Sequence, residues 1–422
     1  QWNEIAIRVE ASADGNGFLG EPPFIMNYFL ECELVGPWQF HAGDDVTPGS
    51  AVAARPAAAA FDAFRESNRV LSRTTQVHGP SLPPAETLAR MKPDAAYAVD
   101  LLLHEPLVAQ PFHASFDERG RLWVTQSRQY PYPAGVRMIS RDKYYRSHYD
   151  RVPPPPPHHD RGADIVSIHE STRRDGVYDR STVFLSGLNM ANAALRGRGG
   201  VWVMHTPHLL FYPDADGDDV PDGPPEVRLS GFGLEDSHAI SNGLVWGPDG
   251  WLYGAQGSTC SCKVVRPGLD PPDAKGVSFP GCMVWRYHPE SRVFEIFSEG
   301  GGNNFGLEFD AAGRLFTGHN GGTTRGWHMV QGGLYQTQAA DPAKYGPPLR
   351  IHAYGELPKL ATTDTVVRFT HFGGFALGTA LPPDHAGRLL ALDPLHNVVT
   401  TSTMLPRGAT FETRDGPPAV RC

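Results

Sequence analysis

The sequence contains little lysine and no long apolar run. Only six of its 37 basic residues are lysines, and its 46 acidic residues give a net charge of −9. We find no basic patch that offsets this charge, so we expect no nucleic-acid partner. No stretch of about 20 apolar residues occurs, so we expect no transmembrane segment within the chain.

Cysteine is also scarce, and several short motifs are missing. Five cysteines are too few for a disulfide framework, and their odd number leaves one unpaired. Cys260 and Cys262 lack the two-residue spacer of a redox or zinc pair, and no Cys-x-x-Cys-His run is present, so we expect no haem site in this chain. No Gly-x-Gly-x-x-Gly run follows a strand, and there is no Gly-x-Ser-x-Gly elbow. Nicotinamide binding and α/β-hydrolase chemistry therefore have no support.

Glycine and proline, by contrast, are abundant. The 46 glycines and 39 prolines make up about one residue in five, while charged residues make up only 20%. This composition favours many short strands joined by turns, and 40% hydrophobic residues are enough to build a core. Because 422 residues exceed one ordinary core, we expect two units or one repeat architecture.

The pattern along the chain predicts three parts. Residues 1–45 contain alternating apolar positions and turn residues, and we interpret them as the end of a β-sandwich. Residues 46–94 are rich in alanine and proline and form a predicted linker, with one short helix within 81–90. Residues 95–422 contain an internal repeat.

The repeated phrase is an Asp/Gly turn that leads into an apolar strand, as in a tight hairpin. Its copies are 116–124, 198–203, 246–254, 309–317 and 385–391. Their glycines are spaced 80, 50, 63 and 74 residues apart, which fits the blades of a propeller with long loops. We therefore predict an all-β fold, a β-propeller of the six-bladed type. About five blades are present, so the ring is expected to be incomplete in this chain.

An acidic turn is the sharpest local signal. Its carboxylates alternate with other residues, among them a glycine, and such a loop can wrap one Ca²⁺ ion with oxygen ligands. The predicted metal ligands are Asp214, Asp216, Asp218 and Asp222. A solvated acidic turn between strands is the alternative interpretation.

A histidine stands just before one of the repeat strands. His238 and Asn242 are expected on a loop at one face of the propeller, near the axis. An imidazole placed there could take a proton from a substrate hydroxyl, so His238 is the candidate general base. The alternative is a histidine bonded to the backbone of a neighbouring blade.

Amide and guanidinium groups supply the other candidate binding residues. Asn303, His319 and Asn320 lie in glycine-rich segments, where the backbone can approach a ligand closely and polar groups can bind sugar hydroxyls or a quinone carbonyl. Arg128 follows the first repeat strand and could add bidentate hydrogen bonds. Ordinary glycine-rich turns between blades are the alternative.

Two segments resemble known families. Phrases within 2–9, 17–20 and 36–40 resemble the closing strands of a galactose-binding-like jelly roll. Residues from about 81 to 400 resemble the propeller domain of the PVC-type membrane-bound dehydrogenases, which are large secreted proteins. The matching phrases are 105–108, 116–132, 152–159, 175–179, 210–218, 238–257, 285–290 and 305–333.

The second resemblance has implications for chemistry. The family's propeller is distantly similar to soluble quinoprotein glucose and sorbosone dehydrogenases, in which a histidine acts as base while hydride passes to pyrroloquinoline quinone beside Ca²⁺. His238 falls near the position of that histidine, and Asn303 matches an asparagine of an Arg-Asn-Pro phrase. Gly302 and Asn304 replace the arginine and the proline of that phrase.

Two functional hypotheses follow. The first is a secreted or periplasmic propeller that oxidises a sugar or sugar-like alcohol, with a cytochrome module outside the chain as a possible electron acceptor. In it His238 is the base, and Asn242, Asn303, His319, Asn320 and Arg128 surround the substrate or quinone. The second is a non-catalytic propeller that binds carbohydrate or serves as a scaffold.

Overall fold

The structure, a computed structural model, describes residues 82–142, 146–319, 324–337, 355–362, 373–378, 381, 383–393 and 397–421. The chain divides into two compact units, Gln1–Pro83 and Pro84–Cys422. The predicted sandwich segment 1–45 lies outside the described residues, as does most of the predicted linker 46–94. The fold described below is that of the second unit.

The second unit begins with the short helix that the sequence predicts. Helix α3 spans Pro84–Arg90, with a proline at its start and Glu86 in its first turn, both of which suit a helix N-terminus. Strand β1 (Lys92–Pro93) follows and pairs antiparallel with β28 (Val420–Arg421). The start and the end of the unit thus share one sheet. Among the described residues no helix is long and apolar enough to cross a membrane.

The first two sheets are four-stranded and antiparallel, and we call them blades 1 and 2. Blade 1 contains β2 (Pro111–Phe116), β3 (Leu122–Gln126), β6 (Asp164–Glu170) and β7 (Arg180–Leu188). Blade 2 contains β8 (Ala191–Arg196), β9 (Gly200–His205), β10 (His208–Pro213) and β11 (Glu226–Ser230). A separate hairpin, β4 (Met138–Arg141) with β5 (Ser147–Tyr149), stands between β3 and β6.

The next two sheets continue the series as blades 3 and 4. Blade 3 contains β12 (Ser241–Trp246), β13 (Leu252–Gln256), β16 (Met283–Tyr287) and β17 (Phe294–Gly301), extended by β21 (Leu334–Thr337) and β22 (Glu356–Leu357). Blade 4 contains β18 (Asn304–Phe309), β19 (Leu315–His319) and β20 (Trp327–Met329). A hairpin of β14 (Cys262–Val264) and β15 (Val277–Phe279) stands between β13 and β16.

The last sheet collects the strands near the C-terminus together with β1. Its other members are β23 (Ala361–Thr362), β24 (Gly374–Phe375), β25 (Leu389–Asp393), β26 (Val398–Arg407), β27 (Thr410–Asp415) and β28. The 3-10 turn η1 (Pro383–His385) leads toward β25. Each of the five predicted repeat phrases therefore feeds a strand: β3, β9, β13, β19 or β25.

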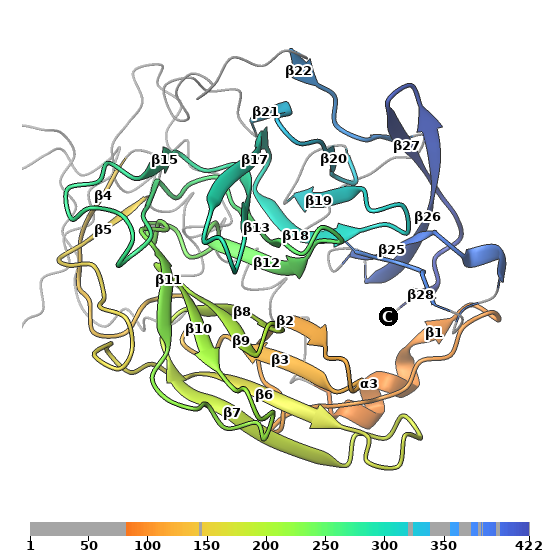
Figure 1. The fold of residues 1–422 in the computed structure, drawn as a ribbon. Helices are drawn as coiled ribbons and strands as arrows, with labels where there is room; N and C mark the ends of the chain where they lie inside the picture. The colour runs from red at the N-terminus through yellow and green to blue at the C-terminus, as the bar shows by residue number, and fades with distance from the viewer. Residues whose placement is uncertain are drawn as a thin grey trace, which may run out of the picture. The chain divides into compact units, whose positions relative to one another are not determined.

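The sheets follow one another around a common centre, with the first strand of each blade innermost (Figure 1). Four buried apolar clusters lie between neighbouring sheets rather than in one shared core. Representative pairs are Trp123 with Val203, Trp202 with Trp285, Tyr253 with Leu315, and Phe316 with Leu389. This is the packing of a β-propeller, and it confirms the predicted fold class.

An aspartate closes the repeated turn of blade 1. The Asp117 carboxylate accepts hydrogen bonds from the amides of Arg119 and Arg121 at 3.0 and 2.9 Å, and from Arg121 Nε at 2.8 Å. It also accepts the indole N–H of Trp123 at 2.9 Å. Gly120 has φ +78°, which a side chain would strain. Local chemistry thus sets the hairpin and fixes a core tryptophan.

Blade 4 repeats this turn at a more exposed position. Asp310 accepts the Arg314 amide at 2.9 Å and Arg314 Nε at 2.6 Å, and Gly313 has φ +73°. The Arg314 side chain is 45% exposed, whereas that of Arg121 is 6% exposed. The same turn is therefore expected to contribute more to the free energy of unfolding in blade 1, where its ion pair is buried, than in blade 4.

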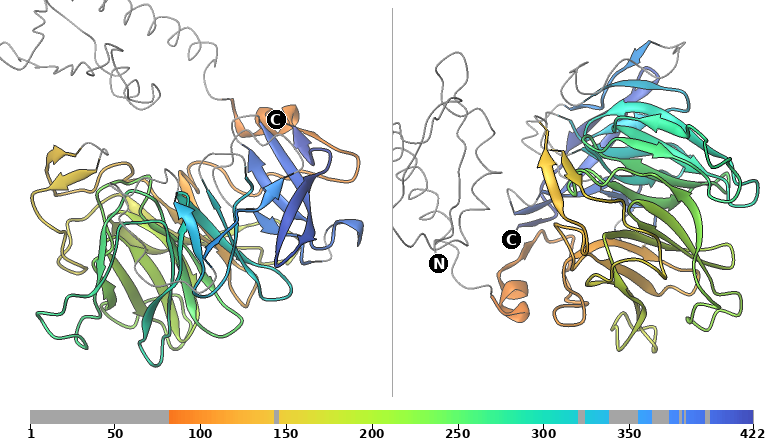
Figure 2. Two further views of the ribbon diagram at one scale, coloured as in Figure 1. Left: turned by 90° about the horizontal axis from the view of Figure 1, so that it is seen from above. Right: turned by 90° about the vertical axis from the view of Figure 1, so that its left-hand side faces the viewer.

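The strand register gives every blade two distinct ends. The first residue of each first strand pairs with the last residue of the second strand, as in Pro111↔Gln126, Ala191↔His205, Ser241↔Gln256 and Asn304↔His319. We call this the loop end, and we call the opposite end, with the repeated turns, the turn end. The sheets stand side by side (Figure 2), and neighbouring strands of blades 1 and 2 run antiparallel. A six-residue strand separates the two ends by about 20 Å.

We predict that Asp117→Ala lowers the free energy of unfolding by about 2 kcal/mol, because the Trp123 indole loses its buried partner and Arg121, which keeps Asp219, loses one of its two carboxylates. The matched change Asp310→Ala should cost about 1 kcal/mol, since Arg314 can be solvated. Urea unfolding followed by circular dichroism measures both. Equal losses would contradict this account of the turn.

Candidate functional site

His238 lies at the loop end, in the connection between β11 and β12. Its Nδ1 is 3.1 Å from Asp236 Oδ1, and its backbone amide donates to the same oxygen at 2.9 Å. A carboxylate only accepts, so Nδ1 carries the proton and Nε2 presents a lone pair. The imidazole side chain is 47% exposed, which leaves room for a ligand to approach it.

Asp236 is positioned by a second partner. Its Oδ2 accepts the hydroxyl of Thr259, which comes from the connection between β13 and β16 of blade 3. Burial raises the pKa of the Asp236 carboxyl, but the hydrogen bonds from His238 and Thr259 outweigh this effect and lower it overall. The carboxylate therefore stays charged and holds the orientation of the imidazole.

An aromatic residue of blade 1 also packs against the His238 ring. The rings of Tyr130 and His238 meet edge to face, with centroids 5.5 Å apart and planes at 81°. Tyr130 lies in the long connection between β3 and β6. The histidine loop of blade 3 is thus in contact with blade 1, so the candidate site spans two blades that are not neighbours.

Asn303 joins the histidine loop to blade 4 but directs its amide to the backbone. Its Nδ2 donates to the carbonyl of His238 at 3.0 Å, and its Oδ1 accepts the amide of Ser258 at 2.9 Å. The approach is close enough to require Gly257, because a Cβ there would lie 2.3 Å from Asn303 Oδ1. Asn303 therefore positions the base.

Asn242 ties blade 3 to blade 4 in a similar way. Its Nδ2 donates to the carbonyls of Ile240 and Asn304 at 3.0 and 3.1 Å, and its Oδ1 accepts the amide of Gly306 at 3.1 Å. The residue is 1% exposed. Both ends of this amide are used within the fold.

The remaining predicted residues also belong to the loop end. Arg128 donates to Gln126 Oε1 from Nη2 at 2.7 Å and from Nε at 3.2 Å, and Gln126 is the last residue of β3. His319 is the last residue of β19, but its side chain is not among the described ones. Asn320 lies outside the described residues.

Two of the predicted cofactor-binding amides make hydrogen bonds within the fold. Asn242 donates both Nδ2 hydrogens to backbone carbonyls, whereas Asn303 donates one and accepts one backbone amide. Their role toward a quinone stays a prediction. Gly302 also offers no side chain where the resemblance calls for an arginine. These residues hold the loop that carries His238, which is a structural contribution to the same site.

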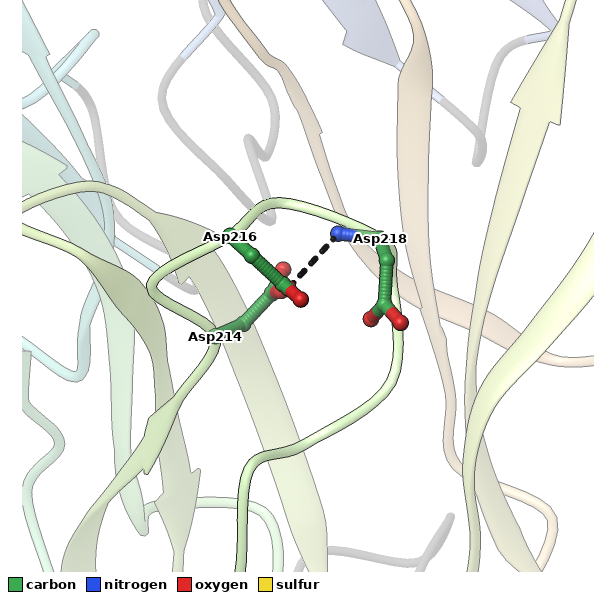
Figure 3. Close-up of side chains that lie close together, drawn as sticks. All are labelled: Asp214, Asp216 and Asp218. Atoms are coloured by element: carbon green, nitrogen blue, oxygen red, sulfur yellow. Dashed lines mark hydrogen bonds between the residues drawn. The ribbon is translucent and has the colours of Figure 1, made fainter.

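The acidic turn lies at the other end of the molecule. It connects β10 to β11 at the turn end of blade 2, since Pro213 pairs with Gly200 while His208 pairs with His205. Ligand oxygens of Asp214, Asp216 and Asp218 lie within 4.8 Å of one another (Figure 3). His238 lies at the loop end, a strand length away from this turn. A metal bound here therefore cannot take part in chemistry at His238.

The fourth predicted ligand, Asp222, makes a hydrogen bond within the turn. Asp222 Oδ2 accepts the amide of Ala215 at 2.8 Å and so closes the loop. The amide of Asp218 donates to Asp216 Oδ1 at 3.3 Å, the bond drawn in Figure 3. Asp222 therefore shapes the loop around the other three carboxylates.

Asp214 carries the strongest sign of a missing partner. Its Oδ2 accepts Arg196 Nη1 at 2.7 Å, but its Oδ1 is buried without a hydrogen-bond partner, and the residue is 1% exposed. An unpaired buried carboxylate oxygen is costly, so a ligand that contacts it would be stabilising. Carboxylate oxygens at this spacing suit a hard cation such as Ca²⁺.

Three arginines from blades 1 and 2 form hydrogen bonds with the acidic turn. Arg119 donates to the Gly217 carbonyl at 3.1 Å, Arg121 donates to Asp219 at 2.9 Å, and Arg196 binds Asp214. The turn contains five carboxylates in 214–222, so two negative charges exceed the three guanidinium groups. A divalent cation would balance this excess.

The described cysteines have no reactive character. Cys260, Cys262 and Cys282 are buried thiols, and Cys260 Sγ donates to the Asp236 carbonyl at 3.2 Å. Burial raises the pKa of Cys260 well above its usual range. A thiol of this kind is a poor nucleophile and a poor metal ligand, in line with the absence of a redox or zinc motif from the sequence.

The partners of His238 are the functional residues that sequence reasoning missed. Asp236 stands two residues before the histidine, a spacing typical of a side chain that caps the following backbone amide, and this signal could have identified it. Thr259 and Tyr130 come from distant parts of the chain. No local pattern points to either of them.

The fold and this site define a β-propeller with a histidine–aspartate pair at its loop end. The chain belongs to the family described as Domain of unknown function (DUF7133), which matches residues 83–418. No curated protein matches the sequence.

Several solved structures are similar to this chain. The PQQ-bound aldose sugar dehydrogenase of Streptomyces coelicolor has 14% identity and a TM-score of 0.41, covering 77% of this chain and 84% of its own. A proposed oxidoreductase (glucose dehydrogenase) from Thermus thermophilus has 14% identity and a TM-score of 0.36, covering 79% and 88%. A proposed 6-phosphogluconolactonase from Bacteroides uniformis has 10% identity and a TM-score of 0.34, covering 74% and 88%.

We predict that Asn303→Ala lowers the free energy of unfolding by about 2 kcal/mol, because the His238 carbonyl and the Ser258 amide lose their partner. The exposed amide of Gln331 provides the control, and Gln331→Ala should leave stability unchanged within about 0.5 kcal/mol. Thermal unfolding of both variants measures this. An Asn303→Ala variant as stable as the parent would show that the amide does not hold the loop.

Proposed function

We propose that the loop end binds a sugar or sugar-like alcohol and that His238 removes the proton of a substrate hydroxyl. The observation that carries the proposal is the bond between His238 Nδ1 and the half-buried carboxylate of Asp236. This bond leaves Nε2 as the basic nitrogen of a half-exposed imidazole. A core histidine satisfied by backbone would not combine these features.

The chain's own residues define the proton-transfer step. Nε2 accepts the hydroxyl proton, the imidazole becomes positively charged, and the Asp236 carboxylate stabilises that charge. Thr259 keeps the carboxylate oriented, and Asn303 fixes the backbone of the histidine. Tyr130 restricts the tilt of the ring. Proton removal is thus prepared before the substrate arrives.

Oxidation needs more than a base. A C–H hydrogen of the alcohol must leave with its electron pair, and a two-electron oxidant must accept it. The family resemblance suggests pyrroloquinoline quinone for that role, a cytochrome module outside the chain as the next acceptor, and a secreted or periplasmic location. We include these three points in the proposal on the strength of the resemblance alone.

The second candidate is a propeller that binds carbohydrate without reacting with it. The amide network of Asn242 and Asn303 supports it, because these groups make hydrogen bonds to the backbone of the loops. The two candidates differ in one respect that can be measured. Only the enzyme requires the basic nitrogen of His238.

The first experiment measures dye reduction by the full chain, equilibrated with pyrroloquinoline quinone and Ca²⁺, on a panel of aldoses. We expect His238→Ala to lose about 100-fold or more of the activity, which is typical for removal of a general base. Asp236→Asn should lose at least about tenfold and should change the pH profile, because the imidazole loses the charge that stabilises its protonated form.

His288→Ala is the matched control, since this half-buried histidine lies beyond β16 at the turn end. It should retain the parent activity. If the parent shows no activity on any aldose, while His238→Ala still binds sugar as the parent does, the enzymatic proposal is wrong and the carbohydrate-binding candidate stands.

We further propose that Asp214, Asp216 and Asp218 hold one structural Ca²⁺ ion at the turn end. The buried, unpartnered Oδ1 of Asp214 supports it, as does the excess negative charge of the turn. The ion would brace the connection between β10 and β11. Its distance from His238 gives it no part in proton transfer.

Calorimetry of the full chain with CaCl₂ tests this site. At 100 times the dissociation constant, Ca²⁺ should stabilise the fold by about 2.7 kcal/mol, and chelation should reverse the rise in melting temperature. The double change Asp216→Asn and Asp218→Asn should abolish the effect. Asp175→Asn is the control, because that aspartate lies in an outer turn of blade 1 and pairs with Arg173. A parent protein that shows neither heat nor a shift would refute the site.

A further inference from the structure

A pocket at the turn end has no part in the proposed function. It has a volume of about 390 Å³ and lies between the turns of blades 1, 2 and 3. Its characteristic side chains are Phe116, Glu118, Arg196, Arg198 and Trp246. This volume falls in the range of pockets that hold small ligands. We call it the turn pocket.

The strand ends show that the turn pocket is separate from His238. Phe116, Arg196 and Trp246 are the last residues of β2, β8 and β12. His238 lies before the first residue of β12, so a whole strand of about 20 Å separates the two places. A ligand in the turn pocket cannot touch the histidine.

Two aromatic rings line the pocket, one from blade 1 and one from blade 3. Phe116 is 66% exposed, which is unusual for a large apolar ring at the end of a strand. The Trp246 ring is fixed, since its indole N–H donates to the Arg196 carbonyl at 2.9 Å. Gly197 makes room for that ring, because a Cβ there would lie 2.6 Å from the indole nitrogen. The fold thus fixes the Trp246 ring by a hydrogen bond and leaves the Phe116 ring exposed to solvent.

The lining also offers charged groups of both signs. The Arg198 guanidinium lies 5.9 Å from the centroid of Trp246, and its contacts to Glu290 and to the Gly250 carbonyl are both long, at 3.4 Å. Exposed pairs of this length contribute little, so the guanidinium is available to a ligand. Glu118 has a side chain that is 65% exposed, and its Oε1 lies 3.3 Å from Arg196 Nε.

Arg198 stands on the tight hairpin turn between β8 and β9. Arg198 and Gly199 have φ +58° and +80°, as a two-residue hairpin turn between antiparallel strands requires. The Gly197 amide donates to the Gly200 carbonyl at 2.9 Å and closes this turn. The turn thus fixes the backbone from which the Arg198 side chain lines the pocket.

This combination of groups selects the class of ligand. A nucleic acid is disfavoured by Asp117 and Glu118 in the lining, and a lipid chain by the guanidinium groups. A sugar ring suits the pocket, because its C–H face can stack on an aromatic ring while its hydroxyl or carboxylate groups bind guanidinium and carboxylate side chains. We propose that the turn pocket binds one or two residues of a carbohydrate chain, with Phe116 stacking on a ring and Arg198 binding its polar edge.

Calorimetry of the full chain tests this site with two probes, cellohexaose and hexagalacturonate. Binding of either supports the proposal, and the probe that binds tells whether the ring is neutral or a uronate. Phe116→Ala and Arg198→Ala should each weaken binding at least about tenfold. The exposed residues Val183 and Arg173 provide matched controls on blade 1, and their changes to alanine should leave affinity unaltered.

His238→Ala separates this site from the one at the loop end, and it should leave binding of the hexasaccharide intact. The proposal is overturned if neither probe binds at millimolar concentration. It is also overturned if binding survives both Phe116→Ala and Arg198→Ala but is lost in His238→Ala. Circular dichroism of the two pocket variants, whose side chains are exposed, verifies that they fold.

Discussion

Antiparallel pairing of the first and second strands is the constraint on which the rest of this propeller depends. The pairing repeats with the same ends matched in four blades, as in Ser241↔Gln256 and Asn304↔His319. A shift by one residue would turn every side chain to the opposite face of its sheet. Because the turn of blade 1 is closed by Asp117, this register is set locally before the blades pack together.

The register also gives the propeller two distinct ends, the loop end and the turn end, and each holds a candidate site. At the loop end, connections between blades bring Tyr130 and Thr259 to the loop that holds both Asp236 and His238. At the turn end, short hairpins place an acidic turn beside a pocket of aromatic and charged side chains. Arg196 belongs to both features of the turn end, since it binds Asp214 and lines the turn pocket.

The sequence predicted the architecture better than the site. Repeated Asp/Gly turns identified five strands correctly, because that chemistry acts within a few residues. It also located His238 on a loop and brought Asp214, Asp216 and Asp218 into one turn. The roles of Asn242 and Asn303 depend on which backbone groups lie opposite them, and only the packing of blade 3 on blade 4 determines that.

Asp236 bonds to Nδ1 of His238 and so makes Nε2 the basic nitrogen of the ring, on which the proposed proton transfer depends. Nitrogen-15 NMR of protein labelled at histidine measures this most directly, with the His238 signal assigned by its absence in His238→Ala. We predict that the neutral imidazole carries its proton on Nδ1, and that Asp236→Asn changes this tautomer distribution. A proton found on Nε2 in the parent protein, with no response to Asp236→Asn, would contradict the account.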